Sequence, residues 1–253
     1  MQLASVKALV TGGVSGLGLA VVKHIVANGG KAVMLDINDE AGAAAEAETG
    51  MKYLRTDVTS EQGVVESVAR AAEINGGLNV AVNCAGILGA GRVLGREAPM
   101  ALSFFSTTIN VNLVGSFNVA KAAADVMQHN DPGEDGECGV IINTASVAAY
   151  EGQIGQAAYS ASKAGLVGLT LPMARELSRF GIRVMTIAPG IFWTPMVDGM
   201  PEHVQESLSA SIPFPSRLGR PEEFAELAAD IIKSAYLNGT TIRLDGAARL
   251  APK

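Results

Sequence analysis

A tyrosine and a lysine lie four residues apart, at Tyr159 and Lys163, and Ser146 lies thirteen residues before the tyrosine. On a helix this spacing places the phenol and the ammonium group on one face. A free tyrosine has a pKa near roughly 10, too high for proton transfer at neutral pH, but a nearby fixed cation favours the phenolate. The pair could therefore exchange protons with a substrate. A bare Tyr-x-x-x-Lys is more often an ordinary amphipathic helix face, so the rest of the chain must decide.

The amino-terminal segment predicts a nucleotide-binding turn between a strand over 7–10 and a helix over 19–26. Gly12, Gly16 and Gly18 allow a sharp turn, close approach of the backbone to a pyrophosphate, and close packing of helix on strand. The amino end of the helix then faces the anion with free N–H groups and a partial positive charge.

Asp36 ends the next strand-like stretch, over 32–36. A carboxylate at this position can accept hydrogen bonds from the adenosine ribose and repels a 2′-phosphate, which favours NAD over NADP. The alternative role for Asp36 is to cap the helix that follows Asn38.

Strand-like runs alternate with helical stretches along the whole chain. This predicts an α/β fold: one doubly wound Rossmann domain over 1–253, with a seven-stranded parallel sheet and helices on both faces. The runs are 7–10, 32–36, 52–56, 80–83, 140–145, 183–188 and 240–244. The motif residues fall at or just after strand ends, where such sheets bind ligands; they are Gly12, Asp36, Asp57, Asn83, Ser146 and Pro189.

With these motifs in order, the chain resembles the short-chain dehydrogenase/reductase family over essentially its whole length. The resemblance implies a catalytic tetrad of Asn112, Ser146, Tyr159 and Lys163. It implies that NAD is bound by Gly12, Ser15, Gly16, Leu17, Gly18, Asp36, Asp57, Val58, Asn83, Cys84, Ala85, Gly86, Tyr159, Lys163, Pro189, Gly190, Phe192 and Thr194. Cys84 departs from the family pattern, which has a second asparagine there, and we interpret it as a small apolar residue rather than a reactive thiol.

The resemblance also implies roles. Tyr159 would exchange the substrate proton, Ser146 would hold the same oxygen, Lys163 would bind the nicotinamide ribose, and Asn112 would hold a water linking Lys163 to solvent. The competing roles are a strand-end cap for Ser146 and a mid-helix polar residue bonded to its own backbone for Asn112. Gln153 and Gln156 could contact the substrate carbonyl or stabilise a turn.

Longer stretches resemble the type II 3-hydroxyacyl-CoA dehydrogenase branch, whose members also act on hydroxysteroids and other secondary alcohols. The stretches are 141–153, 185–192, 213–219 and 238–247. This resemblance implies NAD-dependent interconversion of (S)-3-hydroxyacyl-CoA and 3-oxoacyl-CoA. Residues 86–99 lack the longer insertion of the animal members, so the resemblance does not indicate how the CoA moiety is bound there.

Three alternatives stay open. A reductase of acyl groups on carrier protein is disfavoured by Asp36 and by the acidic chain, since the carrier is acidic too. A hydroxysteroid or simple alcohol dehydrogenase would share every catalytic residue and differ in the lid. A sensor that binds NAD without turnover would not need Ser146, Tyr159, Lys163 and Asn112 together.

The composition limits the partners. The net charge is −6 and no basic run occurs, which argues against nucleic acid and anionic membranes. Apolar residues make up 48% of the chain and charged residues 17%, which indicates that other copies of the chain cover part of its surface. The family resemblance implies that the assembly is a homotetramer.

Two cysteines without zinc-type spacing predict neither a disulfide framework nor a metal site. The absence of a signal-like or membrane-spanning run predicts a cytoplasmic enzyme.

The segment 191–220 is rich in proline and large apolar residues. These are Phe192, Trp193, Met196, Met200 and Phe214, with Pro195, Pro201, Pro213 and Pro215. It suits a mobile apolar lid over the substrate, and an oligomer contact is the competing interpretation. By contrast, the acidic turn 131–137 is expected to be a solvated connection at the edge of the sheet opposite the site.

Overall fold

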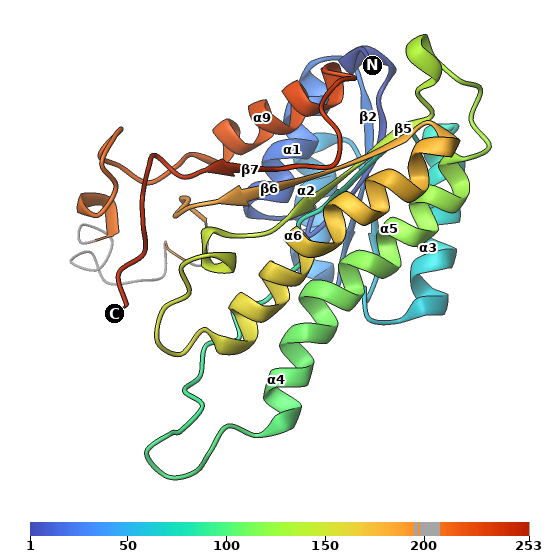
Figure 1. Ribbon diagram of the computed structural model, residues 1–253. Helices are drawn as coiled ribbons and strands as arrows, with labels where there is room; N and C mark the ends of the chain where they lie inside the picture. The colour runs from blue at the N-terminus through green and yellow to red at the C-terminus, as the bar shows by residue number, and fades with distance from the viewer. Residues whose placement is uncertain (195–196, 198–207, 253) are drawn as a thin grey trace.

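The computed structural model describes residues 1–194, 197 and 208–252. Seven strands form one sheet in the order β3-β2-β1-β4-β5-β6-β7 (Figure 1). The strands are β1 Lys7–Thr11, β2 Lys31–Asp36, β3 Lys52–Arg55, β4 Val80–Asn83, β5 Gly139–Thr144, β6 Ile182–Pro189 and β7 Thr241–Leu244. Every neighbouring pair is parallel. The predicted fold and all predicted strands are therefore confirmed, with ends that differ by at most one residue.

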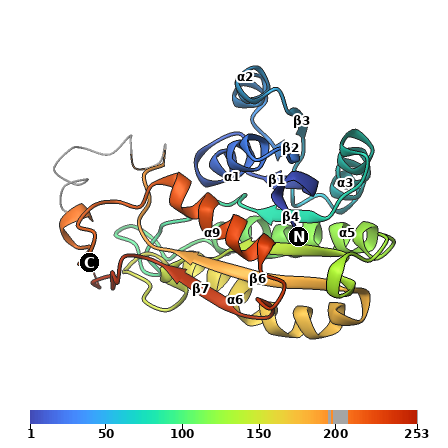
Figure 2. The same ribbon diagram turned by 90° about the horizontal axis from the view of Figure 1, so that it is seen from above.

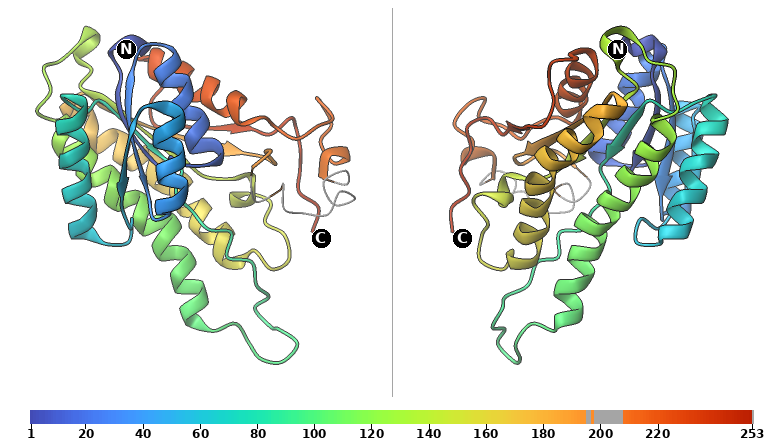
Figure 3. Two further views of the ribbon diagram at one scale, coloured as in Figure 1. Left: turned by 180° about the vertical axis from the view of Figure 1, so that it is seen from behind. Right: turned by 45° about the vertical axis from the view of Figure 1, so that its right-hand side comes forward.

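Helices cover both faces of the sheet (Figure 2). One face carries α1 Gly16–Ala27, α2 Asp39–Thr49 and α9 Pro221–Lys233. The other carries α3 Glu61–Asn75, α5 Gly115–Met127 and α6 Ala157–Leu177, and α4 Leu102–Ile109 extends beyond the sheet and packs against α6. A π-helical turn, Asn110–Val114, joins α4 to α5, so that the two run on as one long helix (Figure 3). Short 3-10 turns occur at Leu3–Ser5, Glu134–Gly136, Val147–Ala149 and Ser178–Phe180.

The central strands are nearly continuous apolar runs because both of their faces are covered. Along β1, Leu9 packs toward α3 and α5, whereas Val10 packs toward α1 and α9. In β5, Ile141 and Ile142 divide in the same way. Burying each such side chain contributes about 1.5–3 kcal/mol, so the two cores hold the strand ends in a fixed register.

The order of the strands reverses at β1, which lies between β2 and β4. The chain builds outward from β1 through β2 and β3, then crosses to β4 and builds in the opposite direction. The crossovers that follow β1 and β4 therefore leave on opposite sides and open a crevice beyond the carboxyl ends of these strands. The predicted site residues lie at this end of the sheet.

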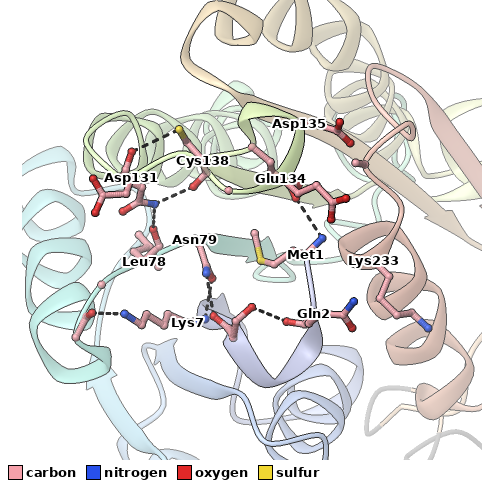
Figure 4. Close-up of a pocket in the computed structure, with 17 residues that line it drawn as sticks. Met1, Gln2, Lys7, Leu78, Asn79, Asp131, Glu134, Asp135, Cys138 and Lys233 are labelled. Atoms are coloured by element: carbon pink, nitrogen blue, oxygen red, sulfur yellow. Dashed lines mark hydrogen bonds and ion pairs between the residues drawn. The ribbon is translucent and has the colours of Figure 1, made fainter.

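The acidic turn 131–137 lies at the other end, where β5 begins, as predicted. Its last residue differs from the prediction of a solvated connection, because the Glu137 side chain is only 9% exposed. One Glu137 oxygen lies 2.7 Å from an Arg183 nitrogen of β6, a buried cation that needs a counter-charge. A cavity of about 680 Å³ opens beside this turn and is lined by Lys7, Asn79 and Lys233 among others (Figure 4). Because it lies at the amino ends of the strands, it is separate from the crevice.

Candidate active site

The amino end of α1 is left open to a ligand. Ser15 precedes α1 without a side-chain capping bond, and the first turn carries no acidic residue. The next two helices are closed: Asn38 accepts a bond from Ala41 N at 3.0 Å and Ser60 accepts one from Gly63 N at 3.2 Å. Both also carry acidic residues in their first turn. The first N–H groups of α1 therefore remain for an anion, as in a pyrophosphate site.

Gly12, before α1, and Gly18, in its first turn, are required by close packing. A Cβ on Gly18 would lie 2.3 Å from the Gly12 carbonyl oxygen, and one on Gly12 would lie 2.9 Å from Ala85 N. Gly12 also has a φ of +61°, which favours glycine. The turn thus fits tightly under α1 and against the end of β4, the cradle that a dinucleotide needs.

The carboxylate of Asp36 is oriented by its own loop. Its Oδ1 accepts hydrogen bonds from Ile37 N at 2.8 Å and Asn38 N at 3.1 Å. Because Asn38 caps α2, the capping alternative for Asp36 is wrong. The Asp57 carboxylate is held in the same way by Thr59, with Oδ1 2.9 Å from the Thr59 amide nitrogen. Both acidic groups stand at strand ends beside the crevice.

The segment after β4 is tied to three neighbouring elements. Asn83 is buried and donates to Asn143 Oδ1 at 2.9 Å and to the Ser116 carbonyl at 3.2 Å. Ala85 N donates to Thr11 Oγ1 at 3.2 Å. A Cβ on Gly86 would lie 3.1 Å from Asn112 Oδ1. Asn83 thus joins β4 to β5, while the backbone that follows it lines the crevice.

Cys84 is a neutral thiol in this structure. Its Sγ lies 3.4 Å from Thr144 Oγ1. Burial raises the pKa of Cys84 to about 11, despite opposing effects of Thr144 and Lys163. A protonated thiol is a poor nucleophile, which agrees with the predicted role as a small apolar residue.

Helix α6 places Tyr159 and Lys163 on one buried face, and Ser146 faces them from the end of β5. Burial raises the pKa of Tyr159, and a hydrogen bond with Ser146 lowers it, the first effect being the larger. Ser146 Oγ also accepts a bond from Ala148 N at 3.1 Å, so its capping role and its contact with the phenol coexist. The expected serine–tyrosine pair is therefore present.

The pKa of Tyr159 is raised overall, although Lys163 lies on the same face of α6. Lys163 Nζ donates to the Thr144 carbonyl at 2.7 Å and lies 5.7 Å from the centre of the Tyr159 ring. Burial lowers the pKa of Lys163 to about 8 and raises the pKa of Tyr159. In the chain without cofactor, desolvation thus outweighs attraction between the two groups.

Asn112 lies fully buried in the π-helical turn. Its Oδ1 accepts a bond from Ile87 N at 2.8 Å, and its Nδ2 donates to Ile87 O at 2.9 Å and Ser162 Oγ at 3.0 Å. These partners belong to other segments, so the alternative of a residue bonded to its own backbone is wrong. Asn112 therefore links the segment after β4, which contains Ile87, to α6. π-Helical turns are frequent at functional sites.

Gln153 and Gln156 are bonded within their own loop. Gln153 N donates to Gln156 Oε1 at 3.0 Å, and Gln153 Nε2 donates to the Ala251 carbonyl at 3.1 Å. These contacts match the turn-stabilising alternative. A contact with substrate stays a prediction for both residues.

The segment after β6 starts close to β7. Gly190 N donates to Leu244 O at 2.9 Å, and a Cβ on Gly190 would lie 2.9 Å from the Asp245 Cα. The ring of Phe192 is buried and packs edge-on against Phe224, with ring centres 6.5 Å apart. Only its backbone is therefore placed to reach a cofactor. Thr194 is half-buried beside it.

The predicted lid is described only in part, at 191–194, 197 and 208–220. Pro195, Met196, Met200 and Pro201 lie outside the described residues. Trp193 and Phe214 are exposed, which leaves apolar surface for a substrate or for another copy of the chain. Both interpretations of this segment remain open.

Two site residues escaped the sequence analysis. The Thr144 carbonyl holds the ammonium group of Lys163, and Ser162 supports Asn112. Ser162 carries a signal in its spacing, three residues after Tyr159 on the same helix. Thr144 carries none, because a backbone acceptor can come from any residue type.

Within 1–194, 197 and 208–252, no group of three or more His, Cys, Asp or Glu could hold a metal ion. In the same part of the chain, no helix is both long enough and apolar enough to cross a membrane. Cys84 and Cys138 are both free thiols.

An open helix end, a glycine cradle and a serine–tyrosine–lysine group beside it define a nicotinamide-dependent oxidoreductase. The family model for short chain dehydrogenases matches residues 6–205. The chain belongs to the short-chain dehydrogenase family.

Relatives match it over nearly the whole length. It is 51% identical to 3-hydroxyacyl-CoA dehydrogenase type-2 of Bos taurus, over 97% of this chain and 95% of that protein. Identity to the Drosophila melanogaster protein of the same name is 48%, over 96% and 97%. The crystal structure of 3-hydroxyacyl-CoA dehydrogenase type-2 from Mycobacterium avium superposes with a TM-score of 0.95 at 43% identity, covering 100% of this chain and 99% of that one.

Proposed function

We propose that this chain is an NAD-dependent dehydrogenase that interconverts (S)-3-hydroxyacyl-CoA and 3-oxoacyl-CoA. The observation that carries the proposal is the grouping of three side chains near the open amino end of α1: the Ser146 hydroxyl lowers the pKa of Tyr159, and Lys163 Nζ lies 5.7 Å from the centre of the Tyr159 ring. The substrate class is supported by the names of relatives that are about half identical over nearly the whole chain.

The chain's residues divide the work of the reaction. When bound, the nicotinamide ring supplies the carbon that accepts or releases the hydride. Tyr159 takes the proton from the substrate hydroxyl in oxidation and returns it in reduction. Ser146 donates a hydrogen bond to the same oxygen, a contact that helps most if it strengthens as that oxygen gains negative charge. Lys163 binds the nicotinamide ribose, and Asn112 holds the water that links it to solvent.

NAD rather than NADP is the proposed cofactor because of Asp36. Its Oδ1 is fixed by two backbone amides at the end of β2, so the carboxylate is an ordered acceptor that could bind ribose hydroxyls. A 2′-phosphate at this place would meet a like charge. We expect Asp36→Asn to narrow the preference for NADH over NADPH in fluorescence titrations, whereas an unchanged ratio would contradict this role.

Turnover of purified protein tests the substrate class. We expect acetoacetyl-CoA to be reduced with NADH at least about tenfold faster than a steroid ketone at equal concentration. The rate is measured as the loss of NADH absorbance. The same assay with acetoacetyl groups on acyl carrier protein and NADPH tests the reductase alternative. Turnover of the steroid alone would favour the hydroxysteroid alternative, and NADH binding without turnover of any ketone would favour a sensor.

We further propose a homotetramer in the cytoplasm. Large apolar side chains lie exposed along α4 and α5, namely Leu102, Phe104, Val114 and Phe117. A row of this kind along a helix supports contact with another copy. Two free cysteines and no disulfide among the described residues support a reducing compartment.

A further inference from the structure

The loop 150–156 connects Ser146 to Tyr159 and is held from two sides. Its Gly155 carbonyl accepts a bond from Gly91 N at 2.7 Å, from the loop before α4. On the other side, Ile154 N donates to the Pro252 carbonyl at 3.0 Å. The carboxyl-terminal segment thus lies beside this loop, as the dark red end of the chain shows (Figure 1). We call 150–156 the site loop and 245–252 the tail.

A forked ion pair joins the site loop to the strand that leads into the tail. Glu151 Oε1 and Oε2 lie 2.8 and 3.0 Å from Nη1 and Nη2 of Arg243, which belongs to β7. Each of the two side chains is 24% exposed, so the pair is largely shielded from water. Two parallel charge-assisted bonds fix orientation as well as distance.

The tail surrounds the same guanidinium group. Arg243 Nε lies 2.7 Å from Asp245 Oδ2, and its Nη2 donates to the Ala248 carbonyl at 3.3 Å. The Tyr150 ring centre lies 5.2 Å from the guanidinium carbon. Arg249 reaches both carboxylates, Asp245 at 3.2 Å and Glu151 at 3.3 Å. Two cations therefore balance two anions in one connected network.

The turn that begins the tail directs it back to the site loop. Asp245 Oδ1 accepts a bond from Ala247 N at 3.0 Å, and Ala247 has a φ of +63°, uncommon outside glycine. Strain of this kind persists only where the surroundings hold it. The surroundings here are the ion pair on one side and the backbone bonds to the site loop on the other.

We propose that Glu151 and Arg243 are positioning residues for substrate: through them the tail holds the site loop, and with it the spacing between Ser146 and Tyr159. The inference rests on the proposed function only in that Ser146 and Tyr159 hold the reacting oxygen. A variant in which the site loop loses this anchor should keep its cofactor crevice, because the crevice is built from other elements. Because Ser146 and Tyr159 both hold the substrate oxygen, a change in their spacing should weaken the binding of substrate and raise KM.

Glu151→Gln tests the inference, because the amide keeps the shape and removes the charge. We expect KM for the ketone or hydroxy substrate to rise about tenfold, with the Kd of NADH within about twofold of wild type. Hydrogen exchange at the Ile154 amide should become faster. Arg243→Lys, which keeps the charge without the fork, should give a smaller rise in KM, and provides a second route if Glu151→Gln folds poorly.

Glu137→Gln is the matched control, since Glu137 forms a largely buried ion pair with Arg183 at the amino ends of the strands, away from the site. It should lower Tm and leave KM unchanged. Equal KM for wild type, Glu151→Gln and Arg243→Lys would overturn the inference, as would a KM effect in Glu137→Gln of the same size. All constants are measured on whichever substrate the wild-type enzyme accepts. Failure of the acyl-CoA proposal would thus appear in the wild type, and failure of this inference only in the ratio of variant to wild type.

Discussion

Burial acts against both ionisable groups of the catalytic pair. It raises the pKa of Tyr159 and lowers the pKa of Lys163, so each group is driven toward its neutral form. Fixed partners oppose the effect of burial in both cases: Ser146 favours the phenolate, and the Thr144 carbonyl accepts a hydrogen bond from the ammonium group. The chemistry of the site therefore depends on a few fixed partners rather than on the charge of Lys163 alone.

Ser146→Ala should shift the pH dependence of alcohol oxidation to higher pH. The hydrogen bond from Ser146 lowers the pKa of Tyr159, so without it the phenolate forms only at higher pH. The loss of the oxygen-binding hydroxyl should also reduce kcat/KM by about 100- to 1,000-fold. The measurement is kcat/KM against pH for wild type and variant. A profile that falls without moving would contradict the role of Ser146 in setting the pKa.

Lys163→Met should be inactive yet more stable at pH 7. Burial lowers the pKa of Lys163 from 10.5 to about 8, so below pH 8 the folded state bears the full cost of a desolvated charge. Between about pH 8 and 10.5 the unfolded chain binds this proton and the folded chain does not, so wild-type stability gains with rising pH in that window.

Removal of the ammonium group should therefore add about 1–2 kcal/mol at pH 7, after the loss of its bond to Thr144. The difference in the free energy of unfolding between Lys163→Met and wild type should be smaller at pH 10 than at pH 7. Urea unfolding of both proteins without cofactor at the two pH values measures it. A variant less stable than wild type at pH 7 would show that Lys163 is well compensated when charged.

At the level of elements, helix α1 and the glycine turn form the cofactor crevice. The helix has an uncapped amino end, and the turn packs so closely that a methyl group on Gly18 would strike the Gly12 carbonyl. Gly18→Ala should therefore abolish NADH binding and lower the free energy of unfolding by about 2 kcal/mol or more. Binding is measured by NADH fluorescence, and stability by urea unfolding.

Gly168→Ala is the control for this change. Gly168 lies within α6, and no atom lies within 4 Å of where its Cβ would be. Alanine there should stabilise the protein by about 0.5–1 kcal/mol and leave NADH binding unchanged. Normal NADH binding by Gly18→Ala would refute the role assigned to the turn.

A feature could be predicted from the sequence where it depends on residues close together in the chain, and could not where it depends on distant segments. The strands were predictable because their apolar runs are local, and the positions of Gly12, Asp36 and Ser146 followed from where those runs end. The partners of Asn112 and Glu137 were not, because they come from segments far away in the chain. The net rise in the pKa of Tyr159 could not be predicted either, since spacing on a helix carries no information on desolvation.

At the scale of the whole molecule, large apolar side chains are exposed to solvent. Leu102 is 77% exposed and Phe117 is 46% exposed on the long helix formed by α4 and α5. Monomeric proteins seldom expose many large apolar side chains on one element, so we expect this helix to be covered in the assembled protein.

Light scattering should give a mass of four times 26.0 kDa for the wild type. Phe117→Lys should give a smaller mass, because a charge would be buried in the contact. Val65→Lys, on the exposed side of α3, is the control and should leave the mass unchanged. A wild-type mass of one chain would rule out the proposed tetramer.

The central claim is that the hydroxyl group of Tyr159 transfers the substrate proton. Tyr159→Phe removes this group and keeps the ring, so NADH should bind with a Kd within about twofold of wild type, while reduction of acetoacetyl-CoA should fall by at least about 1,000-fold. Turnover by Tyr159→Phe within tenfold of the wild-type rate would contradict the account.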